Sequence, residues 1–296
     1  MEAGGDRFGP EGPHSRSRWQ RLKLAIRVFG LVLKAVGLYR RGVRNALDIR
    51  LTELEFAFTD LPAAFDGFTI LHLTDLHVDG LPGTMEAARA HAGGREVDLC
   101  VLTGDYRFRV QGPFEQILPG MAELVAAVRA REGILGVLGN HDDAAMVEEF
   151  ERLGIAMLVN ETRTIRRNGA AIHLTGTDDV HYFYTDAAPA ALAAAPEGFR
   201  IALIHSPELA DRAEGNGYRL YLAGHTHGGQ VCLPGGVPVI THVGRFRRLA
   251  CRRWRLGAMQ GYTSTGVGVS ALPVRFNNRG EVALITLRRG DRQTEL

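Results

Sequence analysis

Short apolar runs recur along the middle of the chain, and each one ends at a group of polar residues. The runs have the length of buried strands, about 4–8 residues. They are 68–74, 99–103, 134–138, 201–204 and 220–223. Helical spacing of apolar residues predicts helices at 83–93, 114–131, 142–153 and 207–214, with a weaker, alanine-rich one at 186–195. Alternating elements followed by a strand-rich part, about 218–287, predict two packed sheets with helices outside.

The first 50 residues follow another pattern. Residues 1–17 are rich in glycine and proline and predict a disordered tail. Residues 18–47 predict one amphipathic helix with a basic polar face. Its apolar positions are Leu22, Ile26, Phe29, Leu33 and Val36, and its polar positions are Gln20, Arg27, Lys34 and Arg41. A strand within 48–58 would join this arm to a body that comprises 48–296.

Charge divides the chain at the same place. Residues 1–50 hold 11 Lys or Arg and four Asp or Glu, a net of +7, whereas the remainder holds 24 basic and 29 acidic residues, a net of −5. A basic amphipathic arm favours contact with an anionic membrane surface, although it could also serve only as a packing element. The acidic body argues against broad binding of nucleic acid, so no nucleic-acid partner is expected.

The arm is expected to lie on a membrane and not to cross it. No segment reaches the 18 or more apolar residues of a spanning helix, and a spanning helix would have to bury Arg27 or Lys34. The three cysteines have no Cys-x-x-Cys spacing, so a disulfide framework is not indicated and a reducing compartment is mildly favoured. We therefore expect a peripheral protein at the cytoplasmic face of a membrane, with a bacterial inner membrane favoured.

Five polar motifs follow the apolar runs. All of them offer oxygen or imidazole nitrogen, which suits Mn, Fe or Zn, and none offers sulfur. They are Asp75-Leu76-His77, Gly104-Asp105, Gly139-Asn140-His141-Asp142, His205 and Gly224-His225-Thr226-His227. Sites in open α/β sheets gather beyond the carboxyl ends of strands. One such histidine alone would more often be structural, but the five motifs together predict a metal site.

The order of these motifs resembles the calcineurin-like metallophosphoesterase family. The extension Gly224-His225-Thr226-His227-Gly228-Gly229-Gln230 looks like the bacterial branch of membrane-associated phosphodiesterases related to YkuE and YaeI. The resemblance covers roughly 66–289 and implies a four-layer α/β/β/α sandwich, with 48–296 as the metallophosphoesterase domain. One departure concerns the Gly-Asp-x-x-Asp motif of many relatives, since Gly104-Asp105 is followed here by Tyr106-Arg107-Phe108.

The resemblance also implies two divalent cations. Asp105 would bridge them; Asp75, His77 and His227 would complete one site, and Asn140, His205 and His225 the other. The spacing of His225 and His227 fits this, because residues i and i+2 share a face of an extended segment. Two cations clamp the oxygens of a phosphoryl displacement and bring the pKa of water towards neutrality.

Two further residues are candidates for catalysis. His141 follows a ligand without being needed for either metal, so it could stabilise the phosphoryl oxygens or protonate the leaving group. Asp142 could orient that imidazole or cap the following helix.

These features predict a dinuclear phosphohydrolase that cleaves a phosphodiester or pyrophosphate, such as that of a lipid-linked molecule, at a membrane surface. The resemblance makes UDP-2,3-diacylglucosamine one candidate substrate. A soluble phosphatase for phosphoproteins or nucleotides is an alternative, against which the basic arm argues. A non-catalytic scaffold is another, against which the presence of Asn140 and His141 argues. The sequence does not indicate the oligomeric state.

For two further segments, the sequence is compatible with two structural interpretations. His181 and Tyr182–Tyr184 could form a loop that reaches the substrate or a packed aromatic corner. Arg245–Arg255 holds six arginines and no acid. It could be a solvated loop, or it could contact anionic lipid or the phosphate of a substrate.

Overall fold

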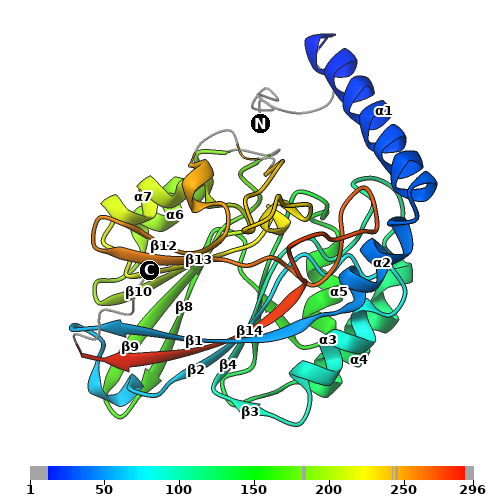
Figure 1. The fold of residues 1–296 in the computed structure, drawn as a ribbon. Helices are drawn as coiled ribbons and strands as arrows, with labels where there is room; N and C mark the ends of the chain where they lie inside the picture. Colours follow the sequence, from blue (N-terminus) through cyan, green and yellow to red (C-terminus); the bar gives the residue numbers. More distant parts are fainter. Residues whose placement is uncertain (1–12, 182–184, 242, 244–245, 291–296) are drawn as a thin grey trace.

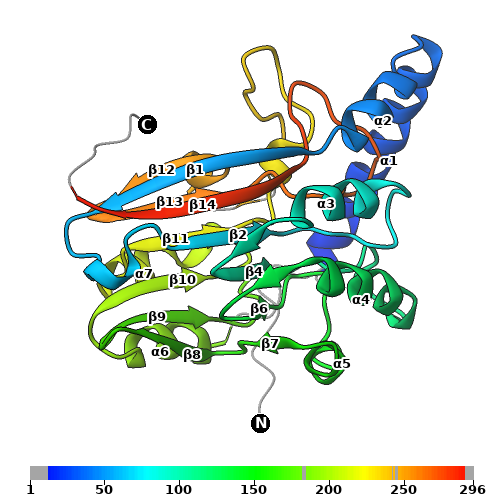
Figure 2. The same ribbon diagram turned by 90° about the horizontal axis from the view of Figure 1, so that it is seen from below.

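Two six-stranded sheets face each other, with helices on their outer faces (Figure 1). This is a computed structural model of the 296-residue chain, and it describes residues 13–181, 185–241, 243 and 246–290. The predicted α/β/β/α sandwich is confirmed. Figure 2 shows the two sheets from below, with α3, α4 and α5 beyond one of them and α6 and α7 beyond the other.

The first sheet has the strand order β1-β14-β2-β4-β6-β7. Its members are β1 (Arg50–Phe58), β2 (Thr69–Leu73), β4 (Leu99–Thr103), β6 (Ile134–Val137), β7 (Ile155–Met157) and β14 (Glu281–Arg289). Strands β2, β4, β6 and β7 run parallel, so the loops after β2, β4 and β6 leave the sheet at one edge. Strand β14 is antiparallel to β2 and parallel to β1.

The second sheet has the order β12-β13-β11-β10-β9-β8. Its members are β8 (Glu161–Arg167), β9 (Ala170–Gly176), β10 (Phe199–Leu203), β11 (Leu220–Ala223), β12 (Arg252–Leu256) and β13 (Met259–Thr263). Strands β9, β10, β11 and β13 are parallel, and the edge strands β8 and β12 are antiparallel to their neighbours. A separate pair joins β3 (Glu96–Val97) to β5 (Arg129–Ala130).

Three apolar clusters fill the three interfaces between the four layers. One lies between the sheets and includes Phe56, Ile70 and Ile201. A second packs the first sheet against helices, and a third packs the other sheet against its own. The body helices are α3 (Thr84–Ala92), α4 (Leu118–Ala127), α5 (Met146–Arg152), α6 (Ala187–Ala194) and α7 (Ala210–Gly215). Short 3-10 turns are η1 (Ala63–Phe65), η2 (Glu115–Ile117), η3 (Pro207–Leu209), η4 (His227–Gly229) and η5 (Arg247–Leu249).

The prediction of a strand-rich part over 218–287 is only partly right. Between β11 and β12, the described residues form 3-10 turns, isolated bridges and irregular loop. The local composition explains this, because Gly228, Gly229 and Gly236 adopt positive φ, which interrupts a strand.

The amino-terminal arm consists of two helices where one was predicted. Helix α1 (Pro13–Ala35) ends before Gly37, and α2 (Tyr39–Leu47) begins after it. Gly37 has φ 75°, the left-handed conformation that ends many helices. Helix α1 begins at Pro13, so it includes residues 13–17 that were predicted as part of the tail, while residues 1–12 lie outside the described part of the chain.

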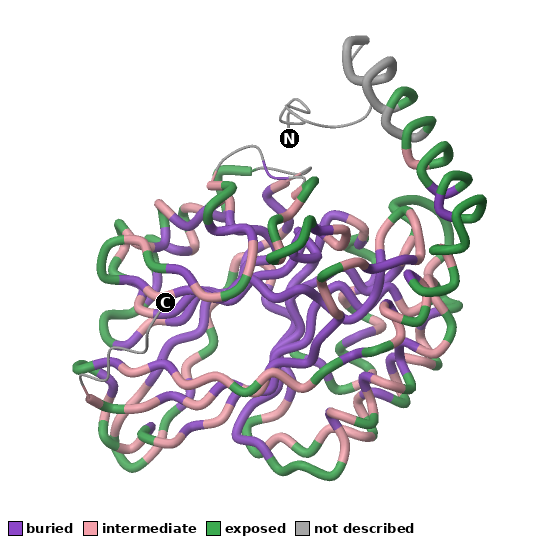
Figure 3. The backbone as a smooth tube through the Cα atoms, in the orientation of Figure 1, coloured by how far each residue is buried: buried purple, intermediate pink, exposed green. Residues whose placement is uncertain are grey.

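The predicted apolar stripe of the arm is divided between two environments, since Leu33 is buried and Val36 is 59% exposed. Gly30, one turn before Leu33, lies against Leu272 of the body. A neighbouring row, Leu24, Val28, Leu31 and Val32, is 50–64% exposed. Figure 3 shows this contrast, with exposed residues along α1 and buried ones through the sheets. Among the described helices, none combines the length and apolar character that crossing a membrane requires.

Candidate metal centre

The predicted ligands lie where strands of both sheets end. Asp75 and His77 follow β2, Asp105 follows β4, and Asn140 follows β6. The second sheet supplies His205 after β10, and His225 and His227 after β11. Because parallel strands end at one edge, side chains 152 positions apart in the sequence meet in one cluster.

The carboxylate of Asp105 lies at the middle of this cluster. Its Oδ2 is 3.4 Å from Nε2 of His205, 3.8 Å from Nε2 of His77 and 3.9 Å from Nε2 of His141. Its Oδ1 accepts a hydrogen bond from the backbone N–H of His141 at 2.8 Å. This carboxylate therefore has one oxygen fixed by the backbone and one turned towards three imidazoles.

On one side of Asp105, three side chains converge. Nε2 of His77 and Nε2 of His227 are 3.2 Å apart, and their rings are stacked at 12°. Nε2 of His227 is 3.4 Å from Oδ1 of Asp75. Potential ligand atoms of Asp75, His77 and His227 all lie within 4.8 Å of one another.

On the other side, the amide oxygen of Asn140 joins two histidines. It is 3.1 Å from Nε2 of His205 and 2.7 Å from Nδ1 of His225. The two ligand groups implied by the family resemblance are thus both assembled in space, with Asp105 within reach of members of each group.

Backbone carbonyls orient three of the imidazoles. Nδ1 of His77 lies 2.8 Å from the carbonyl oxygen of Arg107, Nδ1 of His141 2.7 Å from that of Phe108, and Nδ1 of His205 2.7 Å from that of Thr103. A carbonyl can only accept, so Nδ1 carries the hydrogen and Nε2 faces the cluster. This arrangement is common for histidines that bind metals.

The electrostatics of the cluster suit a bound cation. Burial opposes charge on Asp105 and His205, yet their mutual attraction lowers the pKa of Asp105 well below its usual range and raises that of His205 to about 10. Burial, together with neighbouring imidazoles, lowers the pKa of His77 to about 4 and that of His227 well below normal. His77 and His227 are thus neutral beside an ionised Asp105, the protonation states that metal binding needs, whereas His205 would have to release a proton before acting as a ligand.

The ligand loops have strained backbones. Five cluster residues are in the left-handed region, namely Asp75, His77, Asp105, His225 and His227, with φ between 40° and 69°. Such conformations cost about 1–3 kcal/mol each and persist where the surrounding structure imposes them. Gly224 permits the close approach of two loops, since a Cβ there would lie 2.3 Å from Oδ2 of Asp75.

Asp142 holds the loops of the cluster together. Its Oδ2 accepts from the backbone N–H of Asp105 and of Gly139, both at 2.8 Å, and its Oδ1 accepts from that of Tyr106 at 2.9 Å. Neither role considered for this carboxylate matches these contacts. The imidazole of His141 is oriented by a carbonyl instead, and the next helix, α5, begins only at Met146.

Sequence reasoning missed Arg275, which lies behind His227. Its side chain is fully buried and donates to the carbonyl oxygens of Thr265 and Gly268, both at 2.7 Å. Its Nη1 also donates to the carbonyl of His227 at 3.3 Å. Most of its partners are backbone carbonyls from separate loops, so no local residue pattern indicates such a role.

His181 lies beside the cluster. Its ring centroid is 4.4 Å from that of His225, and Nδ1 is 2.9 Å from a carboxylate oxygen of Glu208. The imidazole of this loop therefore borders the site, whereas Tyr182–Tyr184 lie outside the described residues.

Comparison with known proteins agrees with this geometry. The profile of the family described as calcineurin-like phosphoesterase matches residues 68–229. The chain belongs to the calcineurin-like phosphoesterase family. Among its relatives, the metallophosphoesterase YkoQ of Bacillus subtilis is 26% identical over 88% of this chain and 96% of its own. YkuE of Bacillus subtilis is 28% identical (81% and 86%), and the phosphodiesterase YaeI of Escherichia coli is 30% identical (74% and 82%).

This phosphoesterase is thus a metal-dependent enzyme that hydrolyses phosphoester bonds. The residues present fit a metal, because acidic and imidazole ligand atoms gather in three overlapping groups within the described part of the chain. The altered segment after Asp105 takes part in the cluster through its backbone. Phe108 stands where many relatives have a second acid, and its carbonyl accepts from His141.

Proposed function

We propose that this phosphoesterase binds two divalent cations and cleaves a phosphodiester or pyrophosphate in a lipid-linked substrate at a membrane surface. Asp75, His77, Asp105 and His227 would hold one ion, and Asn140, His205 and His225, sharing Asp105, the other; Mn, Fe and Zn all suit these donors. When bound, the cations would neutralise phosphoryl charge and lower the pKa of water. UDP-2,3-diacylglucosamine is one such substrate, and the name of YaeI supports phosphodiester chemistry.

The side chain of His141 supports a role in proton transfer or charge stabilisation. Its Nδ1 is held by the carbonyl of Phe108, so Nε2 points towards the carboxylate of Asp105. The imidazole is 15% exposed, so a substrate could reach it. As an imidazolium, with a hydrogen on each ring nitrogen, it would donate a hydrogen bond from Nε2 to a phosphoryl oxygen or a proton to the leaving oxygen.

The observation that carries the membrane proposal is the distribution of exposed apolar residues. Among the described residues there are 12 large hydrophobic side chains on the surface, and seven of them lie between Leu24 and Leu38. Four more lie between Leu233 and Ile240. Exposed apolar groups concentrated in this way mark contact surfaces, and basic residues of α1 flank them. We propose peripheral attachment at the cytoplasmic face.

Vesicle co-sedimentation tests this attachment. The variant combines Leu24→Gln, Val28→Gln and Leu31→Gln in the full chain, which keeps every charge and uses a good helix former. Removal of the whole arm is less informative, since Gly42 of α2 packs tightly against Val274 and Phe276. We expect binding to anionic vesicles to weaken at least about tenfold. The control Val110→Gln alters an exposed apolar residue elsewhere. Equal binding of variant and control would refute the attachment.

A substrate panel tests the chemistry. The Mn-loaded protein is assayed with a phosphodiester, UDP-2,3-diacylglucosamine in detergent, a nucleotide monoester and a phosphopeptide. We expect the first two to be cleaved. Hydrolysis of the nucleotide or phosphopeptide alone would replace this proposal with a soluble phosphatase, and no hydrolysis at full metal content would favour a non-catalytic scaffold.

A further inference from the structure

An arginine-rich cavity lies at the open edge of the sandwich, apart from the metal centre. Its volume is about 840 Å³, and its wall includes Arg41 of α2, Arg50 of β1, Arg252 and Arg253 of β12, and Arg279 before β14. Strands β1 and β12 are the edge strands of the two sheets. The loop between β13 and β14 separates the cavity from the metal ligands, and Asn278 of this loop donates to the carbonyl of His227 at 2.7 Å.

The pattern of β1 explains why a cavity forms here. Alternate residues of a strand share a face. On one face of β1, Phe58 and Phe56 are buried between the sheets, and Leu54 packs against them. The same face continues with Thr52 and Arg50, which line the cavity. The apolar core therefore stops at Leu54, and polar groups line the space beyond it.

The wall carries an excess of positive charge. Asp48 pairs with Arg50 at 3.1 Å and with Arg279 at 2.9 Å. Within the described residues, no carboxylate lies within ion-pair distance of the other three arginines, which are Arg41, Arg252 and Arg253. In the described part of the chain, three guanidinium groups beside one cavity thus lack an acidic partner within ion-pair distance.

Glu281, the acidic residue in the cavity wall, already accepts several hydrogen bonds from neutral groups. Glu281 accepts from the hydroxyls of Thr52 at 2.6 Å and Tyr262 at 2.8 Å, and from the backbone N–H of Thr265 at 2.9 Å. Arg253 lies over the ring of Phe56, 4.5 Å from its centroid, and burial lowers the pKa of this guanidinium. It is a partly desolvated cation, which binds an oxyanion more strongly than an exposed one does.

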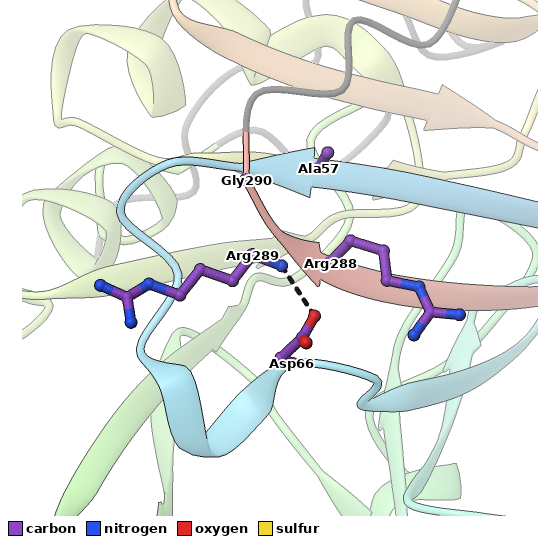
Figure 4. A pocket seen from close by; sticks show the side chains of 5 residues that line it. All are labelled: Ala57, Asp66, Arg288, Arg289 and Gly290. Carbon is purple, nitrogen blue, oxygen red and sulfur yellow. Dashed lines mark hydrogen bonds between the residues drawn. The ribbon is translucent and has the colours of Figure 1, made fainter.

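A second cavity also contains arginines but differs from the first in how they are arranged. It has a volume of about 400 Å³ and lies at the end of β14, where the side chains of Arg288 and Arg289 point away from each other (Figure 4). Arg288 pairs with Glu55 at 2.8 Å, and Asp66 accepts from the backbone N–H of Arg289. Here the arginines diverge and an acid lies between them, so this second cavity does not favour an anion.

We propose that the arginine-rich cavity binds a phosphate-bearing anion at a site separate from the metal centre. Guanidinium groups bind phosphate oxygens through paired, charge-assisted hydrogen bonds. The same chemistry could come from the headgroup of an anionic phospholipid or from a soluble phosphate compound. Two neighbours of the cavity favour the lipid source.

The first neighbour is the loop that exposes Leu233, Val237, Val239 and Ile240. This loop contains Gly236. A Cβ atom added to that glycine would lie 3.5 Å from the guanidinium of Arg252. The second is the arm, since α2 carries Arg41 and continues from the exposed apolar row of α1. A headgroup in the cavity would leave its acyl chains between two apolar surfaces.

Two binding measurements on the metal-loaded full chain test this site. The variant is Arg41→Gln with Arg252→Gln, both exposed, and the matched control is Arg247→Gln with Arg248→Gln, also exposed, in the same arginine-rich segment but outside the wall. Equilibrium dialysis measures labelled inorganic phosphate. Co-sedimentation measures vesicles of phosphatidylcholine that contain a minority of phosphatidic acid.

We expect wild type and control to bind one phosphate more per chain than the variant, or to bind vesicles about tenfold more tightly. A difference seen only with vesicles identifies a lipid headgroup, and one seen only in dialysis identifies a soluble compound. The site is refuted if the variant and its control behave alike in both measurements. Neither measurement involves turnover, so this result is independent of the proposed reaction.

Discussion

Two regions of the molecule depart in opposite ways from the usual rule that polar side chains are exposed and apolar side chains are buried. At the metal centre, two carboxylates and several imidazoles are buried, Asp75 and His77 with no exposed surface at all. Along α1, Leu24 and Leu31 are more than 60% exposed. Buried polar groups and clustered exposed apolar groups are each more informative than the ordinary pattern.

The two regions also differ in what holds their unusual side chains in place. Backbone hydrogen bonds hold the side chains of four of the seven candidate ligands, so the protein itself provides much of the structure around a cation; the four are Asp75, His77, Asp105 and His205. The exposed row of α1 has no such partner among the described residues. All candidate ligands of the centre thus come from one chain, whereas the exposed row of the arm is the surface proposed to contact a membrane. The predictions below test each half of this contrast.

The largest effect is expected for Asp105→Ala. This change removes the carboxylate that lies within 4 Å of three imidazoles, so both groups of ligands lose their common member. The loss of one general acid or base typically lowers turnover by about 10²–10⁴-fold, and we expect a larger decrease here. Elemental analysis after loading with excess Mn should show less than one metal per chain. Asp143→Ala, an exposed acid nearby, is the control. Normal metal content and turnover in the Asp105 variant would exclude this carboxylate as a shared ligand.

His141→Ala should lower turnover by about 10²–10⁴-fold while metal content stays normal. The imidazole contacts the cluster from its edge, and its Nε2 is 3.9 Å from the nearest oxygen of Asp105. His91→Ala is the matched control, because that imidazole bonds to the carbonyl of Ile49 in the body. If the His141 variant loses metal, the residue is a ligand and the assignment of its role to catalysis is wrong.

Asp142→Asn should have a smaller effect. The amide keeps one acceptor oxygen, so it cannot satisfy all three backbone N–H groups that the carboxylate now binds. Groups that support metal ligands usually contribute about 10–100-fold in affinity, and we expect a loss in that range. A titration of apoprotein with Mn measures it. Unchanged affinity would mean that these loops hold their positions without the carboxylate.

The elements around the centre could be predicted because their signals are local. Each apolar run became a strand, and each motif stands at its carboxyl end, as β4 and Asp105 illustrate. The left-handed backbone of Asp75 or His227 has no such signal, because Asp and His adopt it more often than most residues but still only in a small minority of cases. Arg275 is a similar case, because its role depends on carbonyl groups that only the folded chain brings together.

The arm was harder to predict than the body. A helical period continues through Gly37, and one glycine inside such a pattern is often tolerated, so the sequence favoured one helix. Which apolar row faces the body was also ambiguous. Leu33 and Val36 belong to one predicted stripe, yet the first is buried and the second is 59% exposed. Gly30, one turn before Leu33, lies against Leu272, and a contact so distant in sequence leaves no local signal.

Gly37→Ala is expected to have the smallest effect, and it tests how the arm is held. At the centre, Asp and His residues adopt left-handed conformations, which is costly; between α1 and α2, a glycine at φ 75° does so without a side chain. Alanine there should lower the free energy of unfolding by about 1–2 kcal/mol. Gly215→Ala is the control, since that glycine has ordinary φ and open space around its Cβ. Chemical denaturation compares the two.

Turnover on a soluble substrate should stay unchanged, because α1 and α2 supply no ligand to the centre. A Gly37 variant as stable as its control would show that the bend is set by packing and not by the backbone of this residue.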